Sequence, residues 1–159
     1  MQVKNIMTPD PKAIWLTQSL TDAARLMWEN DCGVLPIIKD GRSVVGVITD
    51  RDICMAATMN ARNASAVSVE EVMTGEVFSV TPEDHIDQAL QLMRDHQVHR
   101  LPMISEEGEL QGILSLNDVV LNAKSEAGDA IAYGDIVTTL QAICQHRLPM
   151  QASSVASAG

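Results

Sequence analysis

The sequence predicts an α+β fold of two β-α-β-β-α repeats related by pseudo-twofold symmetry and followed by a C-terminal helix. The first observation is a duplication, because residues 3–53 are echoed at residues 69–119. The second is that strand-like and helix-like segments follow one another in the same order in both copies. Each copy has only about 55 residues, which is marginal for independent folding, so we expect the two to fold against each other. Identical residues recur 66 positions apart: Met7 and Met73, Met27 and Met93, Pro36 and Pro102, Gly46 and Gly112, Asp52 and Asp118.

The first copy is expected to begin with a short strand at residues 13–17 and to continue with a helix. Ser19 is placed to cap this helix, because Asp22 follows three residues later in the spacing of a capping box. Apolar residues then recur at helical spacing and give the helix one face for the core. This stripe consists of Leu20, Ala23, Ala24 and Met27.

A hairpin and a second helix complete the first copy. Residues 35–39 and 44–48 are apolar runs joined by Asp40-Gly41. An Asp-Gly pair between two such runs is a strong hairpin signal, since the turn needs residues that tolerate positive φ. The second helix is expected to begin at Thr49.

The second copy repeats this plan, with a strand at residues 77–80, a hairpin turn at Glu107-Gly108 and a last helix from Ser115. Thr81-Pro82 predicts the start of its first helix, because a threonine N-cap and a first-turn proline are common there. This start implies a two-residue difference between the copies near Thr17 and Thr81. The apolar stripe of that helix consists of Ile86, Ala89, Leu90 and Met93.

Residues 132–146 predict one further helix, whose apolar face must pack on the module or on a second copy of it. That face consists of Ile136, Val137, Leu140, Ile143 and Cys144. Residues 150–159, rich in Ser and Ala, predict a loose tail. The expected division of the chain is residues 1–56 for the first repeat, 57–68 for a linker, 69–125 for the second repeat, and 126–159 for the C-terminal helix and tail.

The composition limits the classes of function. The net charge is −10, and the eleven Lys and Arg residues are scattered singly, which argues against a nucleic-acid partner. The same charge repels a phosphorylated ligand at long range, so a nucleotide site needs local positive charge. The four aromatic residues are too few for several base-stacking platforms.

The cysteines and the hydropathy indicate a cytoplasmic protein without a membrane partner. Cys32, Cys54 and Cys144 are an odd number without a CxxC pair, which indicates reduced thiols and argues against a structural zinc site. No stretch approaches the ~20 apolar residues of a membrane span, and no N-terminal segment is typical of a signal peptide.

The paired motifs resemble a known family. VKNIMTP, VLPII and GVITDRDI in the first copy correspond to VEEVMTG, RLPMI and GILSLNDV in the second. This order resembles a tandem cystathionine β-synthase (CBS) domain pair, the Bateman module, over residues 3–120. The resemblance implies that an adenosine-containing ligand such as AMP, ADP, ATP or S-adenosylmethionine binds between the repeats. It also implies that the module regulates a partner and that two modules pair into a homodimer.

Four candidate binding residues follow from a [ST]-x-x-D motif that opens a helix after a buried strand in each copy. By resemblance, Thr49 and Ser115 would contact phosphate, and Asp52 and Asp118 would hold the ribose. Free N–H groups and the dipole at a helix N-terminus also favour phosphate. The same motif is a capping box, however, in which the hydroxyl and the carboxylate satisfy backbone N–H groups and bind nothing.

Three basic candidates distinguish the copies. A segment similar to His99-Arg100-Leu-Pro contacts phosphate in the nucleotide-sensing subunit of AMP-activated protein kinase, so by resemblance His99 and Arg100 are candidate ligand-binding residues. Arg51 is the third candidate, because it lies inside the first [ST]-x-x-D motif. Their counterparts are Gly33-Val34 and Asn117. The two clefts therefore cannot be chemically equivalent, and we expect unequal affinities or one silent cleft.

Other residues are expected to play structural roles. His96 and His99 are three apart, but no third metal ligand is evident. Trp15 and Trp28 are expected to pack rather than to stack on adenine.

The leading hypothesis is a stand-alone regulatory module that binds an adenine nucleotide and signals to a separate, unidentified protein. The alternative is an interaction or dimerisation scaffold with empty clefts. The two differ in whether the Asp52 and Asp118 carboxylates face an open cleft or fold back onto their own helices. We expect no enzyme activity and no required cofactor, since the sequence has no HExxH motif and no Gly-rich phosphate loop.

Overall fold

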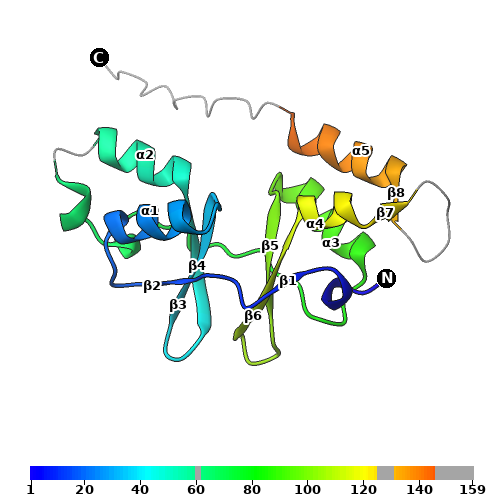
Figure 1. The fold of residues 1–159 in the computed structure, drawn as a ribbon, viewed down its shortest axis with the longest axis horizontal. Helices are drawn as coiled ribbons and strands as arrows, with labels where there is room; N and C mark the ends of the chain where they lie inside the picture. Colours follow the sequence, from blue (N-terminus) through cyan, green and yellow to red (C-terminus); the bar gives the residue numbers. More distant parts are fainter. Residues whose placement is uncertain (60–61, 125–130, 146–159) are drawn as a thin grey trace, which may run out of the picture.

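The computed structural model describes residues 1–59, 62–124 and 131–145, and it shows the predicted α+β fold (Figure 1). The helices are α1 (Leu20–Glu29), α2 (Asp50–Met59), α3 (Ile86–His96), α4 (Leu116–Leu121) and α5 (Tyr133–Ile143). The strands are β1 (Thr8–Pro9), β2 (Ile14–Trp15), β3 (Val34–Lys39), β4 (Ser43–Thr49), β5 (Arg100–Ile104), β6 (Leu110–Ser115), β7 (Ala123–Lys124) and β8 (Ile131–Ala132). Short 3-10 helices lie at Val3–Asn5, Ala64–Ala66 and Val69–Glu71.

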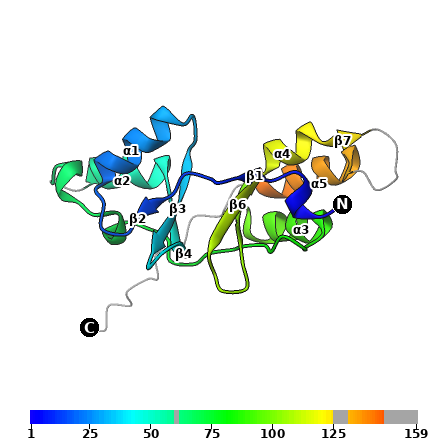
Figure 2. The same ribbon diagram turned by 60° about the horizontal axis from the view of Figure 1, so that its bottom comes forward.

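Each repeat is built on an antiparallel hairpin with one added short strand. The sheet of the first repeat has the order β2-β3-β4, and that of the second has the order β1-β6-β5. The strand expected at residues 13–17 is shortened to β2, which runs parallel to β3. The strand expected at residues 77–80 is reduced to a parallel bridge between Val80 and Met103. The two sheets lie in the middle of the molecule, with α1 and α2 outside one and α3, α4 and α5 outside the other (Figures 1 and 2).

The segment that leads into each repeat pairs with the hairpin of the other repeat. Thr8 in β1 lies opposite Ile113 in β6. Thr74, which leads into the second repeat, exchanges two N–H···O bonds of 3.0 Å with Val47 in β4. The repeats are thus interlocked, as expected for units too small to fold alone.

Two methionine–glycine contacts explain part of the repeated sequence. Met7 covers Gly112, and Met73 covers Gly46. A Cβ on Gly46 would lie 2.8 Å from the Met73 Sδ and 2.9 Å from the Thr74 carbonyl oxygen. Glycine is therefore required where a lead-in segment crosses a strand at close range.

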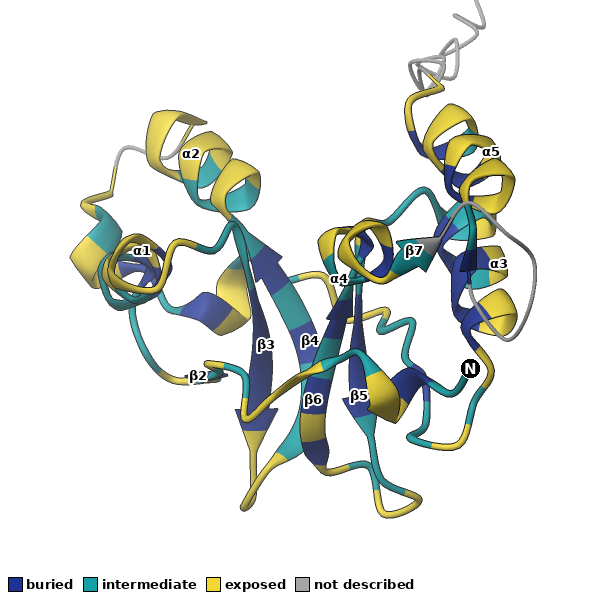
Figure 3. Cartoon of the chain, turned by 45° about the vertical axis from the view of Figure 1, so that its right-hand side comes forward, coloured by how far each residue is buried: buried dark blue, intermediate teal, exposed yellow. Residues whose placement is uncertain are grey.

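The tips of the two hairpins also meet. The Arg42 Nε donates a hydrogen bond to the Leu110 carbonyl at 3.0 Å, and the Leu110 N–H donates to the Arg42 carbonyl at 3.0 Å. In the first hairpin Asp40 and Gly41 have φ values of 40° and 82°, which confirms the expected tight turn. Figure 3 shows both hairpins side by side, with their tips pointing away from the helices.

The helix starts agree with the sequence except in α3. Ser19 caps α1 through a capping box with Asp22, as expected. The predicted start at Thr81-Pro82 is wrong, because α3 begins at Ile86 after His85. The Thr81 N–H donates instead to the Asp84 carboxylate at 2.7 Å in a separate turn. Ile86 is 66 residues after Leu20, the start of α1, so the helices follow the same offset as the motifs.

Each repeat has its own hydrophobic cluster. The whole predicted stripe of α3 is buried, and so are Leu20, Ala23 and Met27 of α1, whereas Ala24 is exposed. The inner surfaces of β3 to β6 are also largely buried (Figure 3). Burying these apolar side chains stabilises the fold by about 1.5–3 kcal/mol for each large residue.

The predicted C-terminal helix is α5, which packs along α3. Its buried residues are Ile136, Thr139 and Ile143. Val137 and Leu140, which were expected on the same face, are exposed because the contact face is rotated toward Thr139. His146 and the expected tail at residues 150–159 lie outside the described residues. Within the described part of the chain, no helix combines the length and the apolar character needed to cross a membrane.

Candidate ligand-binding cleft

A cavity of about 1280 Å³ lies where the two repeats meet. Its walls are formed by β3, β4 and the start of α2, by residues 74–78 and the loop after α3, and by the end of α5. Five predicted site residues line it: Thr49, Arg51, Asp52, His99 and Arg100. Ser115 and Asp118 lie outside this cavity. The cleft therefore combines the [ST]-x-x-D motif of the first repeat with the His-Arg pair of the second.

This combination crosses the repeats. Within its own sheet Arg100 lies opposite Ser115, and Thr49 lies opposite Val34. The cavity instead places Arg100 with Thr49 and Asp52, because the two hairpins face each other across it.

The first [ST]-x-x-D motif forms a closed capping box. The Thr49 hydroxyl donates to the Asp52 Oδ2 at 2.7 Å, and the Thr49 N–H donates to the same oxygen at 2.9 Å. The Asp52 N–H donates to the Thr49 Oγ1 at 3.1 Å. These hydrogen bonds use only one carboxylate oxygen, so Asp52 keeps its Oδ1 as an acceptor at the edge of the cleft.

The second motif has the same geometry. The Ser115 hydroxyl and N–H donate to the Asp118 Oδ2 at 2.6 and 2.8 Å, and the Asp118 N–H donates to the Ser115 Oγ at 3.1 Å. Both carboxylates thus fold back onto their own helices, as the scaffold alternative requires. The predicted ribose roles of Asp52 and Asp118 stay predictions.

The N-terminus of α2 differs from the sequence-based expectation of free N–H groups. The Asp50 N–H donates to the Gly33 carbonyl at 3.1 Å, and the Arg51 N–H donates to the Asp50 Oδ1 at 2.7 Å. The Asp52 N–H is taken by Thr49. Because these three donors are occupied within the chain, a phosphate in this cleft would depend on side-chain donors.

Two guanidinium groups supply such donors. Arg51 is exposed and Arg100 is half-buried. Among residues 1–59, 62–124 and 131–145, neither guanidinium has a hydrogen bond or ion pair. The carboxylates that line the same cavity are Asp50, Asp52, Glu76 and Asp95. Four carboxylates against two guanidiniums leave a net charge of −2 on the cleft when its histidines are neutral, so the cleft is not strongly basic.

Several cavity residues carry no motif and were missed in the sequence. Phe78 stacks on His96, with ring centroids 3.5 Å apart and an interplanar angle of 16°. Phe78 is the only phenylalanine of the chain, and this rarity is the one feature of the sequence that could have singled it out. Within the described part of the chain, no three His, Cys, Asp or Glu side chains are grouped to hold a metal ion.

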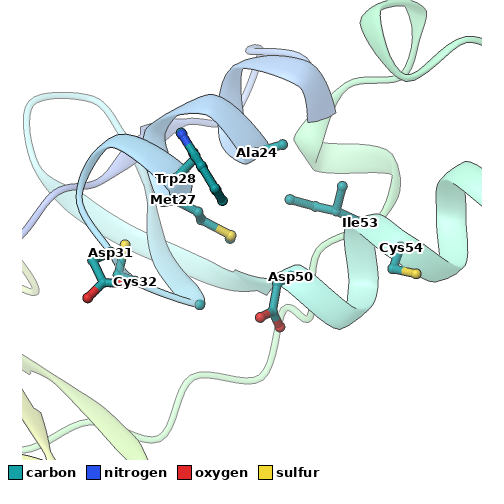
Figure 4. Close-up of a pocket in the computed structure, with 9 residues that line it drawn as sticks. Ala24, Met27, Trp28, Asp31, Cys32, Asp50, Ile53 and Cys54 are labelled. Carbon is teal, nitrogen blue, oxygen red and sulfur yellow. The ribbon is translucent and has the colours of Figure 1, made fainter.

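A second cavity of about 450 Å³ lies between α1 and α2 and shares Gly33 and Asp50 with the cleft. Figure 4 shows Met27 and Trp28 reaching it from α1 and Ile53 from α2. Trp28 is 88% exposed, so the expectation that it packs is wrong. Cys32 also lines this cavity, and burial raises the pKa of its thiol.

Comparisons with known proteins identify both repeats. The CBS domain family matches residues 3–58 and 69–124. The CBS domain-containing protein YhcV of Bacillus subtilis is 35% identical over 131 residues, which cover 81% of this chain and 91% of YhcV.

Two solved structures extend the comparison to three dimensions. A crystal structure of Hypoxic Response Protein I with two coordinated zinc ions is 30% identical with a TM-score of 0.72, and covers 78% of this chain and 100% of that one. A hypoxic response protein 1 is known from Mycobacterium tuberculosis. A crystal structure of CBSX2 in complex with AMP is 26% identical with a TM-score of 0.65, and covers 76% of this chain and 93% of that one. CBSX2 is a protein of Arabidopsis thaliana.

Proposed function

Because the chain belongs to the CBS domain family, we propose that it is a regulatory module that binds an adenosine-containing ligand between its two repeats. The observation that carries this proposal is the cavity that brings Asp52 of the first repeat together with His99 and Arg100 of the second. The structure of CBSX2 with AMP supports the class of ligand.

The cleft offers a suitable group for each part of AMP. The Arg100 and Arg51 guanidiniums, with the His99 ring, would donate charge-assisted hydrogen bonds to the phosphate. The Asp52 carboxylate would accept hydrogen bonds from the ribose hydroxyls through its Oδ1. The apolar side chains of Pro102 and Ile113 in the same cavity would contact the adenine ring.

The charge of the cleft favours a monophosphate. Four carboxylates line the cavity beside two guanidiniums. Each further phosphate adds negative charge near those carboxylates, so we expect AMP to bind more tightly than ADP, and ADP more tightly than ATP.

Regulation would follow from contact with both repeats. A ligand that touches both stabilises one arrangement of them, and a partner protein that recognises this arrangement would read the signal. In this proposal the module has no catalytic role and requires no cofactor. The free thiols of Cys32, Cys54 and Cys144 suit a reducing compartment such as the cytoplasm.

A homodimer is part of the proposal. Large apolar side chains are exposed on the helical side of the molecule, with Trp28 at 88%, Met59 at 76% and Leu121 at 82% exposure. A second copy of the chain would cover them and remove their apolar surface from water.

The second candidate function is a dimerisation or interaction scaffold that binds no nucleotide. The observation that favours it is that both [ST]-x-x-D motifs are closed capping boxes.

A thermal-shift panel with AMP, ADP, ATP, S-adenosylmethionine, NAD and a GMP control tests the proposal. A ligand at ~100 times its dissociation constant adds about 2.7 kcal/mol and should raise the unfolding midpoint by several degrees. A selective shift with an adenosyl ligand supports the sensor. No shift with any ligand at millimolar concentration contradicts it and supports the scaffold.

A further inference from the structure

The end of α5 forms part of the cleft although it lies beyond residue 124, where the family match ends. Ile143 and Gln145 line the same cavity as His99 and Arg100. The helix α5 packs along α3, and Figure 1 shows its C-terminal end turned toward the middle of the molecule. The cavity therefore has a wall that neither repeat supplies.

A hydrogen bond to a buried threonine fixes the middle of α5 on α3. Thr139 is fully buried, and its Oγ1 accepts a hydrogen bond of 2.9 Å from the Arg94 Nη1. The same hydroxyl donates to the Asp135 carbonyl at 2.7 Å. Ile136 and Ile143 belong to the hydrophobic cluster of the second repeat, so α5 is an integral part of that core.

Gln97 connects the end of α5 to the loop that carries the basic pair. It follows α3 in the left-handed conformation, with φ of 51°. Its Nε2 donates to the Ala142 carbonyl at 3.0 Å and to the Gln145 carbonyl at 3.2 Å. Both carbonyls lie at the C-terminal end of α5, where the i+4 backbone donors run out. The Ala142 carbonyl also accepts the Gln145 N–H at 3.3 Å, so Gln97 adds a second donor to this turn. The side chain of Gln97 thus caps α5, while its backbone leads within two residues to His99.

We propose that the end of α5 takes part in binding the ligand. Ile143 contacts the bound ligand. The two hydrogen bonds from Gln97 to α5, called the Gln97 clamp below, hold residues 97–100 in the position that binds phosphate. Ile143 is a ligand-contacting residue, and Gln97 is a positioning residue. This inference rests on the proposed nucleotide function for the identity of the ligand, but the clamp itself is a property of the ligand-free chain.

A consequence is that the ligand and α5 stabilise each other. If the docked helix holds the loop that binds phosphate, then bound phosphate must hold the docked helix to the same extent, because coupling between two sites is reciprocal. The cleft would in this way control the docking of an element outside the repeats.

The first arm of the test uses ligand-free protein and amide hydrogen exchange on the full chain. Gln97→Asn suits the left-handed backbone but is one methylene too short to reach the α5 carbonyls. It should speed exchange in residues 98–100 and 142–145. Gln141→Ala, an exposed change on the same helix, is the matched control and should leave both segments unchanged. Unchanged exchange at residues 98–100 in Gln97→Asn overturns the clamp.

The second arm adds AMP. In the wild type, AMP should slow exchange in residues 139–145 as well as in the repeats. Gln97→Asn and Ile143→Ala should each weaken AMP binding about threefold to tenfold, with no more than a twofold change in Gln141→Ala. Ile143→Val, which leaves a smaller cavity, should show a smaller loss in the same direction and replaces Ile143→Ala if that variant does not fold.

The outcomes separate this inference from the proposed function. Slowing in the repeats without slowing in α5 overturns the inference and leaves nucleotide binding intact. No response to AMP anywhere in the chain contradicts the proposed function, and the first arm still decides whether Gln97 holds the loop.

Discussion

The surroundings of the two [ST]-x-x-D motifs differ although the motifs themselves are built alike. Around the first motif lie Arg51, His99 and Arg100. At the corresponding positions, 66 residues away, the chain has Asn117, Gly33 and Val34. The two repeats thus share the capping motif, but basic side chains accompany it on only one side.

What is conserved between the repeats is what the fold needs. Both motifs cap their helices with hydrogen bonds of nearly equal length. Both lead-in segments place a methionine over a glycine of the other repeat. Positions that neither cap a helix nor fill a crossing can differ between the repeats without harm to the fold. The basic residues present on only one side are therefore better explained by function than by folding.

The largest expected effect is at Arg100. Arg100→Ala should weaken AMP binding roughly tenfold to a hundredfold, the scale of a lost hydrogen bond to a charged group. Adenosine binding should change little, because adenosine has no phosphate. Titration calorimetry with both ligands measures this, with Arg25→Ala, the loss of an exposed arginine outside the cavity, as the control. An equal loss for adenosine and AMP would show that Arg100 does not bind phosphate.

The two crossing glycines should respond unequally to a methyl group. Gly46→Ala brings its Cβ within 2.9 Å of the Thr74 carbonyl oxygen, whereas the nearest backbone atom to Gly112 is the Thr8 oxygen at 3.2 Å. The closest neighbour of Gly112 is the far end of the flexible Met7 side chain. We expect both changes to lower the free energy of unfolding by about 1–3 kcal/mol, with the larger loss for Gly46→Ala.

Urea unfolding of both glycine variants checks this order. A larger loss for Gly112→Ala would mean that the methionine contact, and not the backbone contact, limits the space at the crossings.

A third comparison concerns the paired carboxylates. Asp52→Asn should weaken AMP binding by about 1 kcal/mol, because the amide is a poorer acceptor for ribose hydroxyls than a carboxylate. Asp118→Asn should leave AMP binding unchanged, since Asp118 lies outside the cavity. Each asparagine keeps a side-chain oxygen for the cap, so folding is preserved. An equal loss in both variants, measured by titration, would argue for two equivalent clefts.

The smallest expected effect is a loss of stability at low pH that involves the lead-in segment of the second repeat and not that of the first. The Arg62 side chain, with the Ser68 N–H, lowers the pKa of Glu71 to about 2. Its counterpart in the first repeat is the uncharged Asn5, 66 residues earlier. Because the pKa of Glu71 is lower in the folded state, its stabilisation is present above the ordinary value of 4.5 and is lost as the pH falls toward 2.

Thermal unfolding between pH 7 and pH 2.5 measures this contribution. Glu71→Gln should unfold at a midpoint that falls less steeply below pH 4.5 than in the wild type, and Asn5→Ala should keep the wild-type slope. If the unfolding midpoint falls with pH equally steeply in Glu71→Gln and in the wild type, Glu71 does not contribute to the loss of stability in acid.

The sequence predicted the local elements better than their contacts. A capping box was predictable wherever an aspartate follows a serine or threonine by three positions, as it does after Ser19, Thr49 and Ser115. The structure confirms all three capping boxes. Thr81-Pro82 carries an equally good local signal, but its N–H bonds to Asp84 and the helix starts later. Local chemistry alone does not choose between two adjacent caps.

The composition of the cleft could not be predicted from either repeat alone. The hairpin register places Arg100 opposite Ser115, and only the way the repeats face each other brings it to Asp52. Ile143 and Gln97 were missed because their role depends on where α5 docks, which a helical pattern does not specify.

We propose that the cleft between Asp52 and Arg100 binds the nucleotide and that the corresponding position beside Asp118 binds none. The most direct test is the stoichiometry of AMP binding, measured by titration calorimetry on protein of known active fraction. We predict one AMP per chain in the wild type and no measurable second site at millimolar AMP. Two sites per chain, or one site that survives Arg100→Ala but is lost in Asp118→Asn, would show that the nucleotide does not bind between Asp52 and Arg100.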